Sequence, residues 1–270
     1  MVAGGSGASA TQWLEVNNVS LRYELSGSGA STLVLLHGQQ LSLESWDEIL
    51  PALRAGHRVL RYDSRGFGLS EKIRGNLTID DEVSDLAALL DALQIPEPVT
   101  LIGESVGGAI ALKFAAAHPG RVRAIAVTNP AAYLQAQPER TAAAASGENQ
   151  APRATLERSA EAIYPVEVRA PARYARFRGM LLANDPASVA ATTRMIYSTA
   201  FADVLPKIQC PALVVAMALY PRPVVSLKEL ANAMPKGEFV VLQTGQFASL
   251  ESPEMLLPVL QKFLAAHAGS

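Results

Sequence analysis

The chain has 270 residues, 49% of them hydrophobic, and its formal net charge is −2 at neutral pH. This length suits one α/β domain with an insertion, and the near-neutral charge without a basic patch argues against a nucleic-acid partner. No apolar run has the length needed to span a bilayer. The single cysteine, Cys210, cannot form an intrachain disulfide and suits a reducing compartment. We therefore expect a cytoplasmic protein without a membrane or nucleic-acid partner.

Residues 1–10 are mostly Gly, Ala and Ser without a basic segment, which predicts a flexible tail rather than a signal peptide. Strand and helix patterns alternate after it. Predicted strands lie at 13–16 and 21–25, as a hairpin around an Asn-Asn turn, and then at 32–36, 58–62, 99–102 and 123–128. Predicted helices lie at 45–53, 79–93 and 109–117. This alternation implies a mostly parallel sheet with helices on both faces.

The alternation stops near residue 130 and resumes near residue 205. Between these points, helical patterns at 156–163, 172–183 and 186–198 accompany a polar stretch at 141–153, a predicted mobile loop. The last part has predicted strands at 212–216 and 238–242 and predicted helices at 226–234 and 253–266. We expect residues 11–130 and 205–270 to form an α/β core and residues 131–204 to form an inserted helical cap.

A Gly-Glu-Ser-Val-Gly sequence at residues 103–107 connects a predicted strand with a predicted helix. G-x-S-x-G at such a junction is typical of a nucleophile elbow, a sharp turn that exposes a serine above the sheet. Gly103 and Gly107 have no Cβ atom to collide across that turn. The pattern also fits a glycine-rich turn whose serine only caps the helix. We take Ser105 as the candidate nucleophile.

Several further motifs occur along the chain, and both their sequences and their order are informative. They are Leu36-His37-Gly38, Trp46, residues 63–70 (Asp-Ser-Arg-Gly-Phe-Gly-Leu-Ser), residues 103–108, His118-Pro119, residues 211–215, and Gly245-x-Phe247 through Glu251-x-Pro253. With these motifs the chain resembles the α/β-hydrolase family over nearly its whole length, and in particular 3-oxoadipate enol-lactonases and related small capped esterases. The resemblance implies an α/β-hydrolase fold with an inserted helical cap.

In this family the serine works with a histidine and a carboxylate, and the resemblance places other residues at those positions. The histidine position holds Gln246, the usual acid position holds Tyr220, and Asn129 stands at a second acid position that some relatives use. An amide cannot accept a proton near neutral pH, and removal of the base costs about 10⁶-fold in turnover. We therefore predict a degenerate triad at Ser105, Gln246 and Tyr220, in which Tyr220 is able to hydrogen-bond Gln246.

The resemblance implies the remainder of the site as well. It places the oxyanion-hole donors on the backbone N–H groups of Gln39 and Val106. The residues that we expect around the substrate pocket are His37, Gln40, Glu104, Met217, Leu219 and Phe247. His37 is also the nearest candidate for a substitute base. No phosphate-binding glycine motif and no His or Cys cluster with metal spacing occurs, so we expect neither a cofactor nor a metal.

Three functions remain open. The first is a non-hydrolytic enzyme that cyclises, eliminates, decarboxylates or rearranges a small hydrophobic carbonyl compound, because oxyanion donors in a closed pocket stabilise charge without a nucleophile. The second is a non-catalytic protein that binds such a compound. The third is an ester or lactone hydrolase that uses Ser105 with a rewired base. A homodimer is a further possibility that the sequence leaves open.

Overall fold

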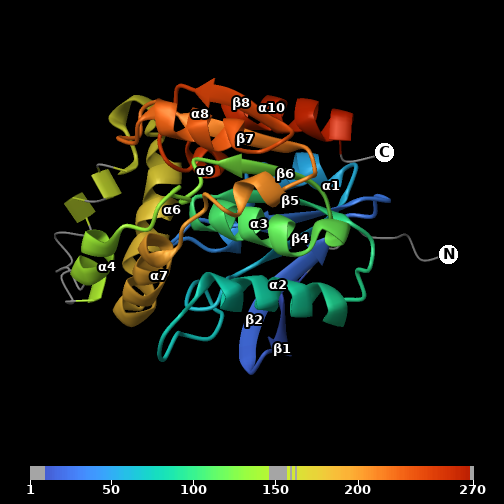
Figure 1. Cartoon of the computed structure of the whole chain (residues 1–270), viewed down its shortest axis with the longest axis horizontal. Coiled ribbons are helices and arrows are strands. Elements are labelled where there is room, and N and C mark those ends of the chain that lie inside the picture. Colours follow the sequence, from blue (N-terminus) through green and yellow to red (C-terminus); the bar gives the residue numbers. More distant parts are fainter. Residues whose placement is uncertain (1–9, 146–156, 159, 162, 268–270) are drawn as a thin grey trace.

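The computed structural model of the chain describes residues 10–145, 157–158, 160–161 and 163–267. An eight-stranded sheet runs through it in the order β1-β2-β4-β3-β5-β6-β7-β8 (Figure 1). The strands are β1 (Gln12–Val16), β2 (Val19–Ser26), β3 (Thr32–Leu36), β4 (Arg58–Tyr62), β5 (Val99–Glu104), β6 (Val122–Thr128), β7 (Ala212–Met217) and β8 (Gly237–Leu242). The pairs β1–β2 and β2–β4 are antiparallel, and every other pair is parallel. The predicted α/β-hydrolase fold is confirmed.

Helices cover both faces of this sheet because its central strands are apolar on both sides. In β3, Val34 and Leu36 join the cluster beneath the helices of one face, and Leu33 and Leu35 join the cluster beneath the other. The first face is covered by α2 (Ile79–Ala92), α3 (Val106–Ala117) and α8 (Val224–Asn232), and the second by α1 (Leu50–Arg54) and α10 (Pro253–His267) (Figure 1). This two-residue alternation is the side-chain period of a strand.

The predicted hairpin lies at the edge of the sheet. Asn17 and Asn18 form its two-residue turn with φ angles of 50° and 59°. Two successive left-handed residues are the signature of a type I′ turn, in which Asn is favoured. The predicted Asn-Asn hairpin is thus confirmed, and β1 forms one border of the sheet.

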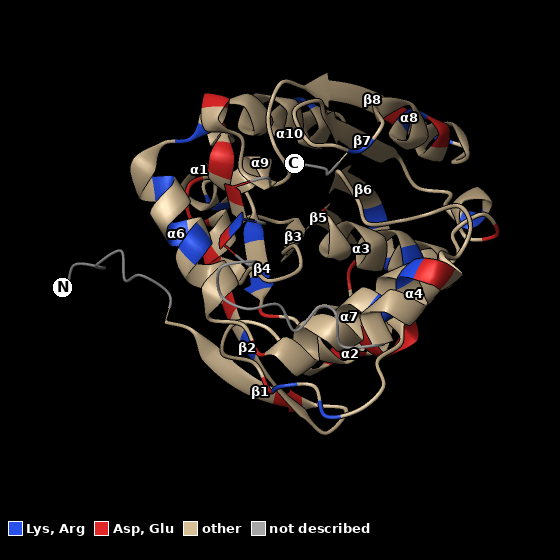
Figure 2. Cartoon of the chain, turned by 90° about the vertical axis from the view of Figure 1, so that its left-hand side faces the viewer, with Lys and Arg blue, Asp and Glu red and all other residues tan. Residues whose placement is uncertain are grey.

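Helices joined by loops form the described part of residues 131–204, with no strand among them. They are α4 (Pro138–Ala145), η3 (Val166–Val168), α6 (Pro171–Leu182) and α7 (Pro186–Ser198), which Figure 2 shows from the cap side. Residues 157–158, 160–161 and 163, within the helix predicted at 156–163, are helical. The mobile loop predicted at 141–153 is wrong for residues 141–145, which end α4, because alanine has the highest helix propensity. Residues 146–153, like residues 1–9 of the predicted tail, lie outside the described residues.

Two local predictions need correction. The helix predicted at 45–53 is divided into the 3₁₀ helix η1 (Leu43–Trp46) and α1, which has Pro51 in its first turn. Proline lacks an N–H group and is favoured where a helix begins, so a new helix begins there. The sequence also did not indicate the short helices η2 (Pro119–Arg121), η4 (Leu205–Lys207) and α9 (Ala248–Glu251). Among the described helices, none has the length and apolar character needed to cross a membrane.

Candidate active site

Ser105 stands between β5 and α3 in a conformation that non-glycine residues rarely adopt, with φ 51° and ψ −110°. Its N–H group donates to the carbonyl of Thr128 at 3.0 Å. Its own carbonyl accepts hydrogen bonds from the N–H groups of Ala109 at 3.1 Å and Ala131 at 2.7 Å. The Ser105 side chain makes no capping bond to α3, so the interpretation as a simple helix cap is wrong. The turn has the strained geometry of a nucleophile elbow.

The glycines that flank the elbow allow three backbone segments to meet closely. A Cβ atom on Gly103 would lie 2.4 Å from the carbonyl oxygen of Gly107. A Cβ atom on Gly107 would lie 2.1 Å from the carbonyl oxygen of Leu36, at the end of β3. Both distances are far shorter than a van der Waals contact. The two glycines therefore bring the N-terminus of α3 against the loop that follows β3.

Gln246 and Asn129 form a buried amide pair. Asn129 follows β6 with φ 41°, and its N–H group donates to the Val215 carbonyl at 2.8 Å. The Asn129 Nδ2 amide donates to Gln246 Oε1. This bond occupies Gln246 Oε1, and Gln246 Nε2 is left to donate to another group. Asn129 Oδ1 is buried and has no hydrogen-bond partner among the described residues. The expected contact between Tyr220 and Gln246 is replaced by this pair, because Asn129 holds the Gln246 oxygen.

Ser105, Gln246 and Tyr220 line one cavity, of about 100 Å³. The structure thus brings the three predicted triad positions together. The complete lining is Gln39, Ser105, Asn129, Ala131, Tyr133, Ile196, Tyr197, Tyr220, Arg222 and Gln246. Apart from Ala131 and Ile196, these side chains carry amide, hydroxyl or guanidinium groups, so the inner pocket is more polar than the sequence indicated. Ile196 and Tyr197 come from α7, so the cap closes the cavity over the serine.

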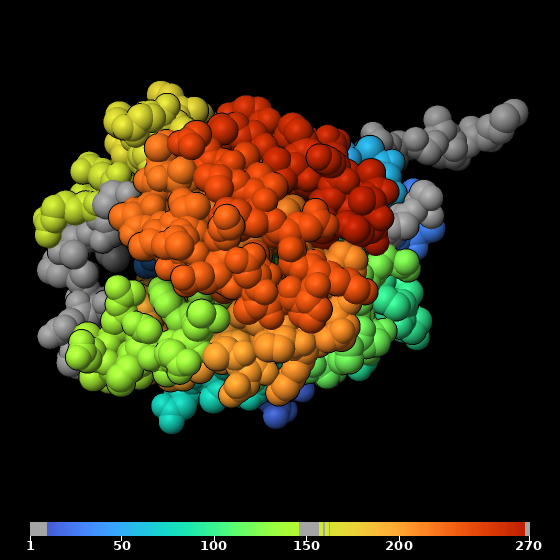
Figure 3. Space-filling model, turned by 45° about the horizontal axis from the view of Figure 1, so that its top comes forward, coloured from blue at the N-terminus to red at the C-terminus, as the bar shows by residue number. Residues whose placement is uncertain are grey.

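Sequence reasoning missed Tyr133, Tyr197 and Arg222 among these lining residues. Tyr133 and Tyr197 lie in the cap region, where nothing in the sequence states which helix face turns toward the sheet. Arg222 was within reach, because it stands two residues after the predicted position Tyr220 and carries a charge in an otherwise uncharged stretch. Figure 3 shows the surface where this segment, in orange, borders the light-green segment that contains α4.

The predicted oxyanion donors have suitable surroundings. Val106 is the first residue of α3, and Gln39 lines the cavity. Within the described part of the chain, neither backbone N–H group donates to a backbone carbonyl. The Gln39 side chain turns to the cap, where Nε2 donates to the Val189 carbonyl at 3.0 Å and to Thr193 Oγ1 at 2.8 Å. Partial positive charge at the N-terminus of α3 favours an anionic oxygen here.

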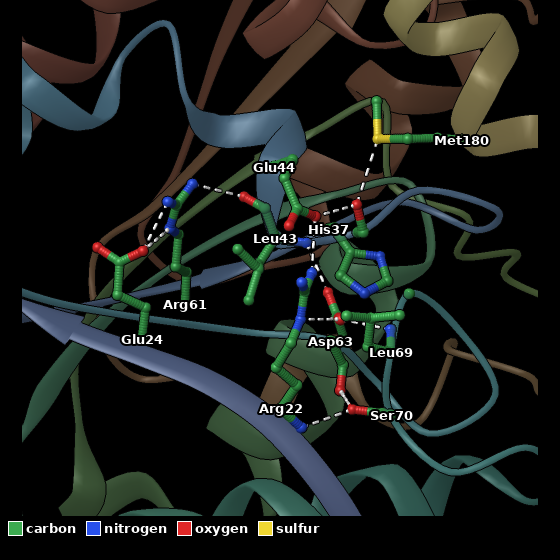
Figure 4. A network of polar contacts seen from close by, with 12 residues as sticks. Arg22, Glu24, His37, Leu43, Glu44, Arg61, Asp63, Leu69, Ser70 and Met180 are labelled. Atoms are coloured by element: carbon green, nitrogen blue, oxygen red, sulfur yellow. Dashed lines mark hydrogen bonds and ion pairs between the residues drawn. The ribbon is translucent and has the colours of Figure 1, made fainter. Parts of the chain in front are cut away.

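His37 is committed to the loop around it and does not line the cavity. Its Nδ1 donates to the Gly38 carbonyl at 2.8 Å, and its Nε2 accepts from the Ser64 N–H group at 3.0 Å. Burial lowers the pKa of the imidazole, which is 2% exposed. Figure 4 shows it beside the network around Asp63, where Arg22 Nε donates to the carboxylate at 2.7 Å. With both ring nitrogens occupied, the substitute-base hypothesis for His37 is not supported by this geometry.

Glu104 faces away from the cavity although it precedes Ser105. Its carboxylate accepts hydrogen bonds from the N–H group of Ser249 at 3.0 Å and from its hydroxyl at 2.7 Å. Burial raises the pKa of Glu104 to about 7. Nearby Glu251 accepts from the Phe247 N–H group at 3.0 Å, and burial raises its pKa to about 8. The Glu104 carboxyl group thus joins β5 to α9 behind the elbow, the Glu251 carboxyl group bonds the start of its own helix, and neither lines the pocket.

The other predicted pocket residues also lie outside the lining of the cavity. Met217 ends β7 and is fully buried in the core cluster. Phe247 packs against Phe177 of α6, with 5.9 Å between ring centroids. Gln40, with φ 66°, occupies a tight turn, where its carbonyl accepts from Asn184 Nδ2 at 2.9 Å. Leu219 is half-buried beside β8, and its N–H group donates to the Thr244 carbonyl at 3.0 Å.

Among the described residues, no group of three or more His, Cys, Asp or Glu side chains is placed to hold a metal ion.

Comparison with known proteins agrees with this fold. A family model described as alpha/beta hydrolase fold matches residues 31–201. The solved structure of the enol-lactonase from Burkholderia xenovorans LB400 is similar with a TM-score of 0.86 and 26% identity, over 94% of this chain and 100% of that one. A hydrolase from Pseudomonas aeruginosa PA01 gives a TM-score of 0.86 and 27% identity, over 96% of this chain and 99% of that one.

Among curated proteins, the chain is 31% identical to the cis-3-alkyl-4-alkyloxetan-2-one decarboxylase of Shewanella oneidensis over 124 residues, which is 45% of this chain and 39% of that protein. It is 42% identical over 122 residues to the dihydrolipoyllysine-residue acetyltransferase component of the acetoin cleaving system of Pseudomonas putida, over 44% of this chain and 32% of that protein. These matches span well under half of the relatives' own length. Since the family model covers more than half of the chain, the chain belongs to the α/β-hydrolase fold family.

Proposed function

We propose that this protein is an enzyme that binds a small carbonyl compound at Ser105 and transforms it without serine hydrolysis. The observation that carries the proposal is the Asn129–Gln246 amide pair at the positions where the family places its acid and base. With Oε1 held by Asn129, Gln246 presents Nε2 as a donor. A donor cannot take the proton of the Ser105 hydroxyl, so the serine is not activated as a nucleophile.

The groups that line the cavity are suited to stabilising negative charge. The hydroxyl of Ser105, the Gln246 amide and the backbone N–H groups of Gln39 and Val106 are all hydrogen-bond donors. Burial raises the pKa of Tyr220, so its hydroxyl stays protonated and donates as well. Preorganised donors of this kind lower the barrier of a reaction that builds charge on a carbonyl oxygen.

The reaction class follows from the absence of a base in the described lining. The electron pair must come from a bond that breaks within the substrate. In decarboxylation of a 3-oxo acid, the bond to the carboxylate carbon breaks and CO2 leaves. The electron pair of that bond forms an enolate, whose oxygen accepts hydrogen bonds from these donors. The enolate carbon then takes a proton from water. The Shewanella oneidensis relative is named a decarboxylase of an oxetan-2-one, another small carbonyl compound.

The proposal is tested with purified protein, a panel of 3-oxo acids and cis-3-alkyl-4-alkyloxetan-2-ones, and CO2 release as the readout. We expect acceleration over the uncatalysed rate. Ser105→Ala should keep at least about a tenth of it, because the hydroxyl only donates one hydrogen bond, worth about 1 kcal/mol. Gln246→Leu should cost more, about 100-fold, because it removes a donor and leaves the Asn129 amide buried without a partner.

Two other outcomes contradict the proposal and identify the alternatives. Turnover of aryl esters or lactones that Ser105→Ala abolishes shows a hydrolase with a rewired base. A melting temperature that rises with a carbonyl compound, without turnover of any compound in the panel, shows a binding protein.

A further inference from the structure

A second, larger cavity adjoins the one at Ser105. It measures about 400 Å³ and shares four lining residues with the inner cavity, namely Tyr133, Tyr197, Tyr220 and Arg222. Its other lining residues are Arg140, Pro221, Pro223 and Ser226. A substrate with its carbonyl group at Ser105 therefore extends into a space that contains two guanidinium groups and three phenol rings.

Arg222 is held rigidly at the boundary between the two cavities. Its Nη1 donates to the Pro130 carbonyl and its Nη2 to the Ala132 carbonyl, the latter at 2.6 Å. Its guanidinium carbon lies 4.9 Å from the centroid of the Tyr133 ring. A guanidinium has five N–H donors, so further donors remain for a ligand. Burial lowers the pKa of Arg222.

Arg140 reaches the same space from α4. Its guanidinium carbon lies 5.3 Å from the centroid of the Tyr197 ring, and the rings of Tyr133 and Tyr197 are 5.7 Å apart. The hydroxyl groups of Tyr133, Tyr197 and Tyr220 form no hydrogen bonds with the described residues, so they remain available as donors.

These two arginines differ from the arginines of the core in their electrostatic partners. Arg22, Arg61 and Arg65 each donate to a carboxylate, at distances of 2.7, 2.7 and 2.6 Å. Within the described part of the chain, Arg140 and Arg222 contact no carboxylate and instead lie over aromatic rings. Removing a cation from water is costly unless an opposite charge accompanies it, and this cost falls on the half-buried Arg222, whereas Arg140 is exposed. The outer cavity therefore lacks a negative charge that a ligand would supply.

We propose that the substrate carries a carboxylate at the end remote from its reacting carbonyl, and that Arg140 and Arg222 bind this carboxylate in the outer cavity. The inference rests on the proposed function and specifies its substrate as a small oxo acid whose remote carboxylate is a different group from any carboxylate that leaves as CO2. It also replaces the expectation of a small hydrophobic ligand. The three tyrosine hydroxyls donate to the same carboxylate, and the rings of Tyr133 and Tyr197 hold the guanidinium groups in place by cation–π contact.

The test compares each of two acids, 4-oxopentanoate and 5-oxohexanoate, with its neutral amide. Binding to the full chain is measured by calorimetric titration and by the shift in melting temperature. We expect the dissociation constant of an acid to be about 10-fold lower than that of its amide, the equivalent of about 1.4 kcal/mol. Arg140→Gln should abolish this preference. Arg222→Gln should do so as well, but it also frees the carbonyls of Pro130 and Ala132.

Arg54→Gln is the matched control, since Arg54 is an exposed helical arginine at the end of α1 and its loss changes the net charge equally. We expect it to keep the preference for the acid. The proposal is overturned if neither acid binds more tightly than its amide, or if Arg140→Gln and Arg54→Gln behave alike.

The result also separates this inference from the proposed function. If acid and amide bind equally, and Gln246→Leu weakens both, only the carboxylate assignment fails and the carbonyl site stands. Failure of the proposed function is seen instead in the CO2-release assay.

Discussion

The backbone of Ser105 stores strain that glycine would relieve. Its φ of 51° combined with ψ of −110° costs a non-glycine residue about 1–3 kcal/mol. We therefore expect Ser105→Gly to be more stable than Ser105→Ala by about 1 kcal/mol, as measured by urea unfolding. The same comparison at Ala88, inside α2, should have the opposite sign, because glycine destabilises a helix interior by about 1 kcal/mol. Equal stability of the two Ser105 variants would mean that the elbow is unstrained.

Two substitutions should restore a hydrolytic site around the same serine. In Gln246→His with Asn129→Asp, the carboxylate would orient the imidazole, and the imidazole would accept the Ser105 proton. We expect the unsubstituted protein to hydrolyse 4-nitrophenyl acetate no faster than Ser105→Ala does. The double variant should be at least about 100-fold faster. Adding Ser105→Ala to the double variant should remove the gain, and a gain that survives this third substitution would contradict the design.

At this scale the sequence predicted positions better than contacts. Ser105, Gln246 and Tyr220 were placed by their motifs, and they line one cavity. The partner of Gln246 was not predictable, because Tyr220 and Asn129 follow neighbouring strands, β7 and β6, and only side-chain geometry selects between them. The side chain of Glu104 points away from the cavity because it bonds Ser249, which lies 145 positions further along the chain and is not a neighbour in the sequence.

Among the elements, α7 is tied to the loop after β3 by the Gln39 side chain. Gln39 Nε2 donates hydrogen bonds to the Val189 carbonyl and to the Thr193 hydroxyl. Gln39→Leu keeps the backbone N–H group of the oxyanion hole but removes these bonds, worth about 1 kcal/mol. We expect amide hydrogen exchange in α7 to become about five-fold faster, with α2 unchanged. Gln209→Leu, which removes only an exposed bond to Pro206, is the control. Unchanged exchange in α7 would show that apolar packing alone holds the helix.

The elements themselves were largely readable from the sequence. The strands are short apolar runs, and α7 has the bounds 186–198 that its spacing predicted. The differences arise where local signals compete. The alanines at 142–145 favour helix within a stretch whose polar residues indicated a loop. Pro51 divides a region whose apolar spacing indicated one helix. The short helices η4 and α9 have too few residues to show a period.

At the scale of the whole molecule, buried carboxyl groups make stability depend on pH. Burial raises the pKa of Glu104 to about 7 and those of Glu82 and Glu251 to about 8, from an ordinary value of 4.5. The folded protein therefore binds more protons than the unfolded chain between these values. The stabilisation is complete below about pH 4.5 and is lost as the pH rises through the folded pKa values.

The test is urea unfolding between pH 6.5 and about pH 8.5. Burial lowers the pKa of His37 from 6.5, so the folded imidazole is neutral over that range. The unfolded imidazole is about half protonated at the pH 6.5 end and loses this proton as the pH rises, which adds a smaller slope of opposite sign at that end only. We expect the free energy of unfolding to fall by at least about 1 kcal/mol across the range. Glu251→Gln keeps an acceptor for the Phe247 N–H group and should reduce the fall. A flat profile, or an equal slope in both proteins, would contradict the assignment.

The amide pair also determines how many base changes separate this gene from one that encodes a hydrolase. Codons for glutamine and histidine differ at one base, and so do those for asparagine and aspartate, so two point mutations connect the two chemistries. The first useful step is at Gln246, because the Asn129 amide, turned over so that its unpartnered Oδ1 faces position 246, can accept from an imidazole, whereas a carboxylate opposite Gln246 leaves Ser105 without a base. Random mutagenesis under selection for ester use should therefore fix the change at Gln246 before the change at Asn129.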